Sequence, residues 1–226
     1  MDYCSLSRAN DPACKRCVRH IGIGFFNRCV VLYDSSIACA GTNTYGESWR
    51  GSPEDTTELV PATALAGMKI SSAGSGEGHS CVLVAVSDIN NEVLCVGAGD
   101  RGQLGDGKLS LSRTPVVVQG LPPGRIAQLA VGAYDKCVVY ADPDSLVYCW
   151  GLCLKLFGSN EAAAILGTAG ATAVAESSWE GFSCAVVPDS KVVCWQFGTA
   201  SAQMVAGLQN VERVTVGWYF GCVIVQ

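Results

Sequence analysis

A unit with two cysteines recurs along this chain and limits the folds that it can adopt. In the clearest copy, residues 68–107, Gly76 is followed five residues later by Cys81 and a run of apolar residues. A polar turn then leads to a second cysteine, Cys95, which also lies among apolar residues. Further copies cover residues 21–41, 129–151 and 177–195, and a half copy covers residues 214–226. A chain with such repeats is built from similar structural units placed next to each other.

The apolar runs inside each copy have the composition of β-strands. Residues 30–33 and 138–140 consist of β-branched, aromatic and other apolar side chains, which favour strands. Residues 142–145 and 188–190 are rich in Asp, Pro and Ser, which favour turns. Each copy is therefore predicted to open with a β-hairpin.

Three blocks of the unit resemble the repeat of the regulator-of-chromosome-condensation family in its cysteine-rich form. The first block has Ala-Gly at 73–74 and His-Ser-Cys at 79–81, and the second is Val-Tyr-Cys-Trp-Gly at 147–151. The third is Gly-Gln-Leu-Gly-Asp-Gly at 102–107, which is intact in one repeat. The resemblance covers most of the chain from residue 21 onward. It implies a β-propeller, which in this family usually has seven blades.

The spacing of the repeats suits one four-stranded blade per copy. Five hairpin starts predict an all-β chain with about five four-stranded blades, either a small propeller or part of a larger one. We expect residues 21–226 to form the propeller. We expect residues 1–20 to be a cysteine-rich N-terminal segment that supplies the closing strand of the last blade. The alanine-rich residues 159–166 predict one short helix between blades.

The two cysteines of each full copy are separated by an even number of residues. Directly opposed residues of a hairpin point to the same face, and in a non-hydrogen-bonded pair their Cα atoms lie about 4.5 Å apart, which a disulfide accepts. Reduced core cysteines are the alternative, and a zinc site is disfavoured because no histidine completes a four-ligand set. Four cross-strand disulfides are therefore predicted: Cys29–Cys39, Cys81–Cys95, Cys137–Cys149 and Cys184–Cys194.

The remaining cysteines have no partner within a repeat. Cys222 lies in the half copy, and Cys4 follows a tyrosine as Cys149 does, so we expect a Cys4–Cys222 disulfide that completes the last hairpin. Three cysteines are left over, and one of them is a candidate for a bond to another chain. These three are Cys14, Cys17 and Cys153. Two weaker alternatives remain open: a zinc site formed by Cys4, Cys14, Cys17 and His20, and a redox-active Cys14-x-x-Cys17 motif.

Four tryptophans and one tyrosine divide into two groups. Trp150 and Trp195 directly follow strand cysteines, so they point to the opposite face of the sheet and are predicted to fill the space between blades. Trp49, Trp218 and Tyr219 lie outside the repeated strands and are the candidates for a partner surface.

Charge and cysteine content restrict the class of protein further. The net charge is −5 and no run of Lys and Arg is present, which argues against nucleic-acid binding. No stretch of 18 apolar residues predicts a membrane span. Thirteen cysteines favour an extracellular or luminal compartment. The first residues lack the apolar core of a secretion signal, so we expect a processed or partial chain.

The sequence offers no set of residues for catalysis. His79 stands where the family has a histidine, and a structural hydrogen bond is its expected role. The glycine-rich turns lack a dinucleotide motif, so no cofactor or metal is predicted. We predict a non-enzymatic, disulfide-stabilised β-propeller that serves as a protein-interaction or structural module in an extracellular or luminal assembly. The alternative is an intracellular regulator that resembles the guanine-nucleotide exchange factors of the family.

Overall fold

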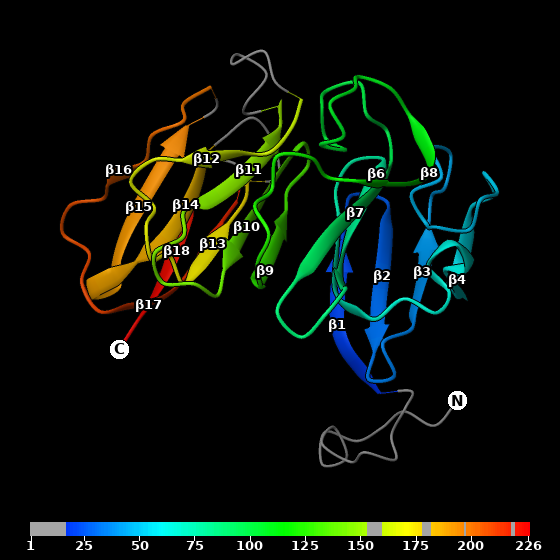
Figure 1. Ribbon diagram of the computed structural model, residues 1–226, viewed down its shortest axis with the longest axis horizontal. Coiled ribbons are helices and arrows are strands. Elements are labelled where there is room, and N and C mark those ends of the chain that lie inside the picture. The colour runs from blue at the N-terminus through cyan, green and yellow to red at the C-terminus, as the bar shows by residue number, and fades with distance from the viewer. Residues whose placement is uncertain (1–16, 153–159, 178–181, 197, 218–219) are drawn as a thin grey trace.

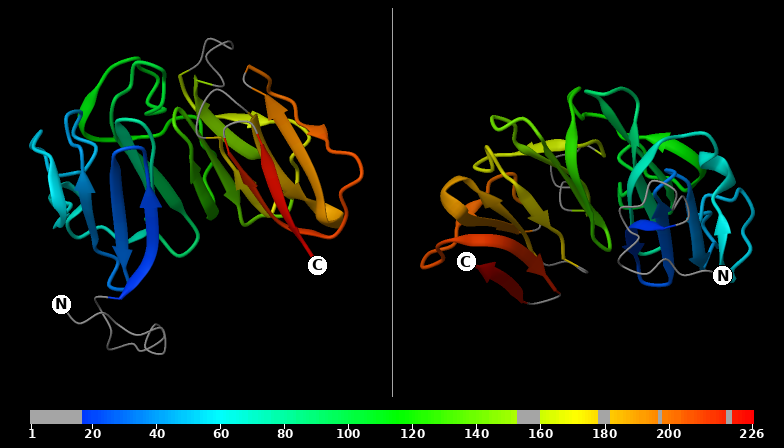
Figure 2. Two further views of the ribbon diagram at one scale, coloured as in Figure 1. Left: turned by 180° about the vertical axis from the view of Figure 1, so that it is seen from behind. Right: turned by 90° about the horizontal axis from the view of Figure 1, so that it is seen from below.

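The computed structural model describes residues 17–152, 160–177, 182–196, 198–217 and 220–226. Within this part the chain is all-β, with two short 3-10 turns, η2 (Thr63–Leu65) and η4 (Pro188–Ser190), and no α-helix. Five antiparallel sheets stand side by side in an open arc, with the first sheet and the last hairpin at its two ends (Figures 1 and 2). None of the described residues forms a helix with the length and apolar character needed to cross a membrane.

Four of the sheets have four strands each, and the fifth has two. Blade 1 contains β1 (Val18–Ile23), β2 (Asn27–Leu32), β3 (Ile37–Gly41) and β4 (Thr56–Pro61). Blade 2 contains β5 (Ile70–Ser75), β6 (His79–Ala85), β7 (Asn91–Gly97) and β8 (Ser112–Val117). Blade 3 contains β9 (Ile126–Val131), β10 (Asp135–Tyr140), β11 (Val147–Gly151) and β12 (Ala163–Ile165). Blade 4 contains β13 (Ala173–Ala175), β14 (Phe182–Val187), β15 (Lys191–Gln196) and β16 (Gln203–Met204), and blade 5 contains β17 (Val211–Val216) and β18 (Gly221–Val225).

Each strand pairs with the next one in sequence, so every blade is a simple meander. The prediction of an all-β propeller of about five blades is confirmed, with two described strands rather than four in the fifth blade. The predicted helix at 159–166 is wrong, because Ala163–Ile165 forms β12 and pairs with β11. Helix propensity is a weak preference, and the open edge of β11 outweighs it here.

The first strands of the blades lie next to one another around the propeller axis. Glycine permits this close approach, since a Cβ atom on Gly76 would lie 2.5 Å from the carbonyl oxygen of Gly132. A Cβ atom on Gly132 would in turn lie 2.4 Å from the carbonyl oxygen of Ser177 in the segment that follows β13. The glycine found five residues before the repeat cysteine is therefore needed for packing at the axis.

Four cross-strand disulfides join the second and third strands of blades 1 to 4. The bonded pairs are Cys29–Cys39, Cys81–Cys95, Cys137–Cys149 and Cys184–Cys194. In each pair the two cysteines are direct partners in the strand register, with Cα atoms 4.1 Å apart. The structure thus contains the four hairpin pairs expected from the even sequence separations.

Each disulfide packs against the opposite face of the following blade. Trp150 of blade 3 lies in one buried cluster with Cys81 and Cys95 of blade 2. Trp195 of blade 4 lies in the equivalent cluster with Cys137 and Cys149 of blade 3. The two tryptophans fill the space between blades, as the alternation of side chains along a strand predicts. The core is therefore a series of similar layers between neighbouring sheets.

The ends of the chain differ from the expected ring closure. Cys222 is exposed and has a free thiol, so the expected Cys4–Cys222 disulfide is not formed. Within the described part of the chain, β1 pairs with β2 in blade 1, and β18 pairs with β17 alone. Because β1 begins at Val18, residues 18–20 belong to the first blade. Cys4, Cys14 and Cys153 lie outside the described residues.

Cys17 bears on the zinc site that was one of the two alternatives for the N-terminal cysteines. It is buried and disulfide-bonded. A disulfide sulfur is not a thiolate, so Cys17 does not offer the zinc ligand that the first alternative required. His20 lies in β1, where its Nδ1 accepts a hydrogen bond of 3.4 Å from the backbone N–H of Ala73.

Candidate functional site at the loop rim

Loops from several blades gather at one end of the propeller axis. Residues 24–26, 76–78 and 132–134 join the first and second strands of blades 1, 2 and 3. The segments 42–55 and 98–111, which follow the third strands of blades 1 and 2, come to the same end (Figure 1). We define the loop rim as Phe25, Phe26, Tyr45, Glu77, Arg101 and Tyr134.

Two consecutive phenylalanines form the blade 1 part of the rim. Phe26 is 65% exposed and Phe25 is close to half exposed. Their ring centroids lie 6.2 Å apart at an angle of 58°. The backbone N–H of Phe25 donates a hydrogen bond of 3.4 Å to the carbonyl oxygen of Gly76 in blade 2. The loop is thus connected to the neighbouring blade while its aromatic rings face solvent.

Tyr45 is a third exposed aromatic side chain at the rim, with 45% of its surface accessible. Its backbone N–H donates a hydrogen bond of 2.9 Å to Oε2 of the buried Glu47. Its ring lies against Gly78, where an added Cβ atom would be 2.8 Å from Cδ2 of the ring. Arg113 of blade 2 donates a hydrogen bond of 3.0 Å to the carbonyl oxygen of Thr44. Tyr45 is therefore held at the boundary between blades 1 and 2.

Glu77, Tyr134 and Arg101 form a polar group beside the aromatic residues. The hydroxyl of Tyr134 donates a hydrogen bond of 2.5 Å to Oε2 of Glu77. The guanidinium carbon of Arg101 lies 4.3 Å from the centroid of the Tyr134 ring, a cation–π distance. Burial, together with the hydrogen bond to Glu77, raises the pKa of Tyr134 to about 12. Tyr134 therefore stays protonated at neutral pH and links blades 2 and 3.

A layer of buried polar side chains supports the rim from below. The amide nitrogen of Asn27 donates a hydrogen bond of 2.9 Å to the hydroxyl oxygen of Ser80 in the next blade. Nδ1 of His79 lies 3.2 Å from the carbonyl oxygen of Glu77, and Nζ of Lys136 donates a hydrogen bond of 2.8 Å to the carbonyl oxygen of Tyr134. Burial, and then the nearby Lys136, lower the pKa of His79 well below its usual value. His79 is therefore neutral and makes the structural hydrogen bond expected of it.

Glu176 extends this polar layer towards blade 4. Its Oε2 accepts a hydrogen bond of 2.7 Å from Ser183. Burial, and then the proximity of Asp135, raise the pKa of Glu176 to about 8. A carboxylate oxygen of Glu176 and the sulfurs of Cys137 and Cys149 lie within 4.8 Å of one another. Because these two sulfurs form a disulfide, they are not thiolate ligands for a metal.

The opposite end of the axis has a different character. A cavity of about 820 Å³ opens there between the first strands of blades 1 to 3. Arg19, Lys69 and Arg125 line it together with several hydroxyl and amide side chains, and Asp88 is the carboxylate among its lining residues. The two ends of the propeller therefore present chemically distinct surfaces, one aromatic and one basic.

The predicted partner-surface residues are not where the sequence suggested. Trp49 is 0% exposed and packs in the core between blades 1 and 2, so its assignment to a surface is wrong. The segment 42–55 folds back over blade 1 and directs Trp49 inward, while the backbone N–H of Ala64 donates a hydrogen bond of 2.9 Å to the carbonyl oxygen of Trp49. Trp218 and Tyr219 lie outside the described residues.

Sequence reasoning missed the rim residues Phe25, Phe26 and Tyr45. A usable signal was present for the two phenylalanines, which directly follow the axial glycine Gly24 in a loop position. Aromatic side chains next to a turn that must lie at the axis cannot enter the core between the sheets. The position of Tyr45 carried no comparable signal, because it depends on how the long segment 42–55 folds.

Comparisons with known proteins agree with this architecture. Residues 90–138 match the family model described as "Regulator of chromosome condensation (RCC1) repeat". The ultraviolet-B receptor UVR8 of Arabidopsis thaliana is 33% identical over 123 residues, which cover 54% of this chain and 27% of the receptor. The human E3 ubiquitin-protein ligase HERC2 is 28% identical over 134 residues, which cover 59% of this chain and 3% of the ligase. The chain thus spans only a small part of these relatives.

Solved structures show the same fold at low sequence identity. Human WBSCR16 superimposes with a TM-score of 0.75 and 15% identity, over 93% of this chain and 60% of that protein. Yeast RCC1 (Prp20), solved bound to Kap60, superimposes with a TM-score of 0.71 and 17% identity, over 91% of this chain and 53% of that protein. At this level of identity the likeness concerns the fold alone.

Proposed function

Because this chain is an RCC1-like repeat protein with a β-propeller fold, we propose that it is a non-enzymatic module that binds a protein partner through the loop rim. The observation that carries the proposal is the group of exposed aromatic side chains Phe25, Phe26 and Tyr45 on a rigid scaffold. Aromatic residues are enriched at protein interfaces, where they supply most of the binding energy.

The support beneath the rim favours binding with little rearrangement. The hydrogen bonds of Phe25 to Gly76, of Tyr45 to Glu47 and of Tyr134 to Glu77 connect its loops to the blades. Loops that are already ordered lose less conformational entropy when a partner binds. A partner that covers the aromatic residues therefore gains most of the free energy from their burial.

The relatives support a binding role rather than catalysis. Yeast Prp20 has been solved in complex with Kap60, and it binds Gsp1p and histones. Among the described residues, the buried neutral His79 has no nucleophile and acid arranged around it for acid–base catalysis. Binding is the simplest activity that this surface supports.

We place the module in an extracellular or luminal setting, as a component of a larger assembly. Thirteen cysteines, with a disulfide in each of the four complete blades, are typical of an oxidising compartment. Mass spectrometry of the alkylated, unreduced protein tests this setting. Oxidised hairpin pairs in protein from its native source are expected, and eight free thiols at these positions would contradict the assignment.

The binding site can be tested by placing a photo-crosslinking residue at Phe26. Ile89, which is 72% exposed in the turn between β6 and β7 at the other end of the blades, is the matched control position. We expect partner crosslinks from position 26 but not from position 89. The variants F26S and Y45S should then weaken binding of the captured partner by about tenfold or more each, while I89S should not. Equal losses for all three variants would reject the loop rim as the site.

The exchange-factor alternative retains one specific point of support. Yeast Prp20 shares this fold and binds Gsp1p. Release of a labelled nucleotide from a small GTPase, measured with and without the chain, tests the alternative. Acceleration that is lost in F26S and Y45S would make the rim an exchange surface, and no acceleration would leave the binding module as the function.

A further inference from the structure

The cavity at the end of the axis opposite the loop rim collects positive charge from three blades. It has a volume of about 820 Å³, and we call it the axial cavity. Arg19 of blade 1, Lys69 at the start of blade 2 and Arg125 at the start of blade 3 line it, and all three side chains are exposed. Within the described part of the chain, none of the three forms an ion pair. Their charge is therefore available to a ligand.

Two of the cations occupy equivalent positions in successive repeats. Lys69 and Arg125 each stand directly before the first strand of a blade, seven residues before the axial glycine of that blade. The carbonyl oxygen of Lys69 accepts a hydrogen bond of 2.9 Å from the backbone N–H of Ala85, and that of Arg125 accepts one of 2.8 Å from the N–H of Ala141. The backbone of both residues is thus fixed to the second strand of the same blade.

Contacts between blades hold the walls of the cavity together. The backbone N–H of Ile70 in blade 2 donates a hydrogen bond of 3.3 Å to the carbonyl oxygen of Ser35 in blade 1. The N–H of Ile126 in blade 3 donates one of 3.0 Å to Oδ1 of Asn91 in blade 2. The N–H of Asn91 in turn donates one of 3.2 Å to the carbonyl oxygen of Gly124. The cavity is therefore formed before a ligand arrives, which reduces the entropy lost on binding.

Uncharged polar side chains lie beside the cations. His20, Ser72 and Gln128 line the cavity, and each is four residues before the axial glycine of its blade. The amide of Gln128 bonds to the backbone of blade 4, but the buried Oγ of Ser72 has no hydrogen-bond partner among the described residues. Because Nδ1 of His20 accepts a hydrogen bond from Ala73 and burial lowers the pKa of His20, its ring is neutral with the proton on Nε2. Ser72 and His20 thus offer hydrogen-bonding groups without adding charge.

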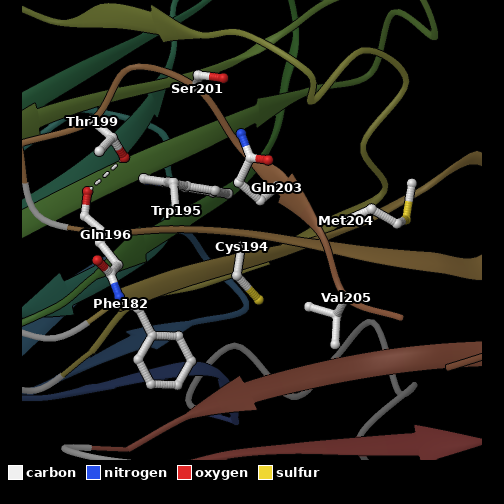
Figure 3. Close-up of a pocket in the computed structure, with 9 residues that line it drawn as sticks. All are labelled: Phe182, Cys194, Trp195, Gln196, Thr199, Ser201, Gln203, Met204 and Val205. Atoms are coloured by element: carbon white, nitrogen blue, oxygen red, sulfur yellow. Dashed lines mark hydrogen bonds between the residues drawn. The ribbon is translucent and has the colours of Figure 1, made fainter. Parts of the chain in front are cut away.

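Two other grooves of the molecule lack this positive charge. The groove of blade 4 has a volume of about 660 Å³, and its lining residues, which include Phe182 and Cys194, are apolar or carry hydroxyl and amide groups (Figure 3). A smaller groove of about 330 Å³ is lined by Glu92 and otherwise by uncharged residues. The chain as a whole has a net charge of −5. Among these three hollows, the concentration of cations is therefore specific to the axial cavity.

The size and lining of the axial cavity indicate the chemistry of its ligand. Sites for small molecules commonly have volumes of about 300–1,000 Å³, and this cavity falls in that range. Cations from three separate blades suit a ligand with several anionic groups, since Arg and Lys bind phosphate and related oxyanions. The hydroxyl and amide groups of the lining suit a ligand that also carries hydroxyls. The negative charge of the rest of the chain disfavours a long polyanion that extends over the surface.

We propose that the axial cavity binds a small polyanion, namely a sugar or cyclitol that carries several phosphate or sulfate groups. The anionic groups pair with Arg19, Lys69 and Arg125, and the ring hydroxyls bond to the polar side chains of the lining. Asp88, the carboxylate of the lining, opposes this binding and limits the affinity. The site lies at the opposite end of the axis from the loop rim, so either proposal can fail without the other.

Isothermal titration calorimetry of the full chain with two charged probes tests the proposal. One probe is an inositol trisphosphate and the other is a trisulfated heparin disaccharide, and unsubstituted inositol and the unsulfated disaccharide are the neutral controls. The variants R19Q, K69Q and R125Q each remove one charge from the cavity. K191Q is the matched control, because Lys191 is an exposed cation at the start of β15, at the same end of the propeller, and does not line the cavity.

We expect at least one charged probe to bind with a Kd below about 1 mM and the neutral controls not to bind. R19Q, K69Q and R125Q should each weaken binding by about fivefold or more, because hydrogen bonds to charged groups are the strong ones. K191Q should leave the affinity unchanged. D88N removes the carboxylate of the lining and should strengthen binding by about twofold or more.

The two probes also distinguish the kinds of anion. Preference for one of them identifies phosphate or sulfate as the recognised group, and equal binding shows that both are accepted. The rim variants F26S and Y45S should bind the probe as the unaltered chain does. Failure of both probes to bind with a Kd below about 1 mM would overturn the proposal. So would losses of affinity in K191Q that equal those of the cavity variants.

Discussion

Tyr134 and Glu77 belong to neighbouring blades, and the hydroxyl of Tyr134 donates a hydrogen bond of 2.5 Å to the Glu77 carboxylate. Their backbones are connected as well, since the N–H of Glu77 donates a hydrogen bond of 3.2 Å to the carbonyl oxygen of Ala133. Blades 2 and 3 are thus joined at the loop rim by side-chain and main-chain contacts, although each blade folds from its own repeat. Contacts of this kind set the position of the rim.

The Tyr134–Glu77 contact should contribute measurably to stability. Y134F removes the hydroxyl and leaves a partly buried carboxylate oxygen without its donor, so we expect a loss of about 1–3 kcal/mol in the free energy of unfolding. Urea unfolding followed by tryptophan fluorescence measures the change. Y33F, which alters an exposed tyrosine in a hairpin turn, should change the free energy of unfolding by less than about 0.5 kcal/mol. Equal effects of the two variants would contradict the role given to Tyr134.

The raised pKa of Glu176 predicts that stability falls as the pH rises. The carboxyl group has a pKa of about 8 in the folded chain, above its ordinary value of 4.5, so the folded state binds a proton more tightly than the unfolded state. The resulting stabilisation is complete below pH 4.5 and is lost as the pH rises through 8. Since each pKa unit corresponds to about 1.4 kcal/mol, the total effect is on the order of several kcal/mol.

This pH dependence can be separated from that of His79. The pKa of His79 is lowered in the folded chain. The contribution of His79 to the free energy of unfolding is therefore lost as the pH falls below the ordinary histidine value of 6.5. Urea unfolding between pH 6.5 and 8.5 therefore reports mainly on Glu176. E176Q keeps an oxygen acceptor for Ser183 and should flatten the dependence in this range. An unchanged slope in E176Q would show that the dependence comes from another group.

Crowding at the axis predicts that Gly76 does not tolerate a side chain. A Cβ atom there would lie 2.5 Å from the carbonyl oxygen of Gly132 and 2.2 Å from Cε1 of His79, both in packed surroundings. We expect G76A to lower the free energy of unfolding by about 2–3 kcal/mol, as overpacking does. Gly67 has a φ of +81° and no neighbour within 4 Å of an added Cβ atom, so G67A should cost about 1 kcal/mol from backbone strain alone. Urea unfolding compares the two, and a larger loss for G67A would argue against close approach at the axis.

The four disulfides should differ in their resistance to reduction. Cys194 is partly accessible beside the groove of blade 4, whereas the cysteines of the other three pairs are fully buried. Access of the attacking thiol limits the exchange rate. We therefore expect the Cys184–Cys194 disulfide to be reduced first, at a rate about tenfold higher than that of the other pairs. Timed reduction with a small thiol, followed by alkylation and mass mapping, measures the order. Simultaneous reduction of all four pairs would indicate global unfolding instead.

Local features of the sequence were sufficient to predict the hairpins and their disulfides. The partner of Cys29 lies 10 residues away and that of Cys81 lies 14 residues away, so each pair depends on one turn and the strict alternation of strand side chains. The same alternation placed Trp150 and Trp195 between blades. In these cases sequence separation is short, and the residues that decide the outcome lie in the same repeat.

Features that depend on contacts between repeats could not be predicted from the local sequence. Ala163 and Ala164 favour a helix by themselves, but they pair with the open edge of β11 and form β12 together with Ile165. Trp49 resembles an exposed loop residue in sequence, but the fold of segment 42–55 buries it between two blades. Both errors arise because the free energy of a distant contact exceeds a local preference of less than about 1 kcal/mol per residue.

The sequence by itself determined the repeat, the hairpin at the start of each repeat and the four cysteine pairs, because short turns bring these residues together within one hairpin. Only the tertiary structure decided that Phe25 bonds to Gly76, that Tyr45 lies against Gly78 and that Tyr134 bonds to Glu77. It also decided that β1 is the first strand of blade 1, where it pairs with β2. The physical reason is that the order of blades around the axis is set by the packing of one repeat on the next, which no single repeat encodes.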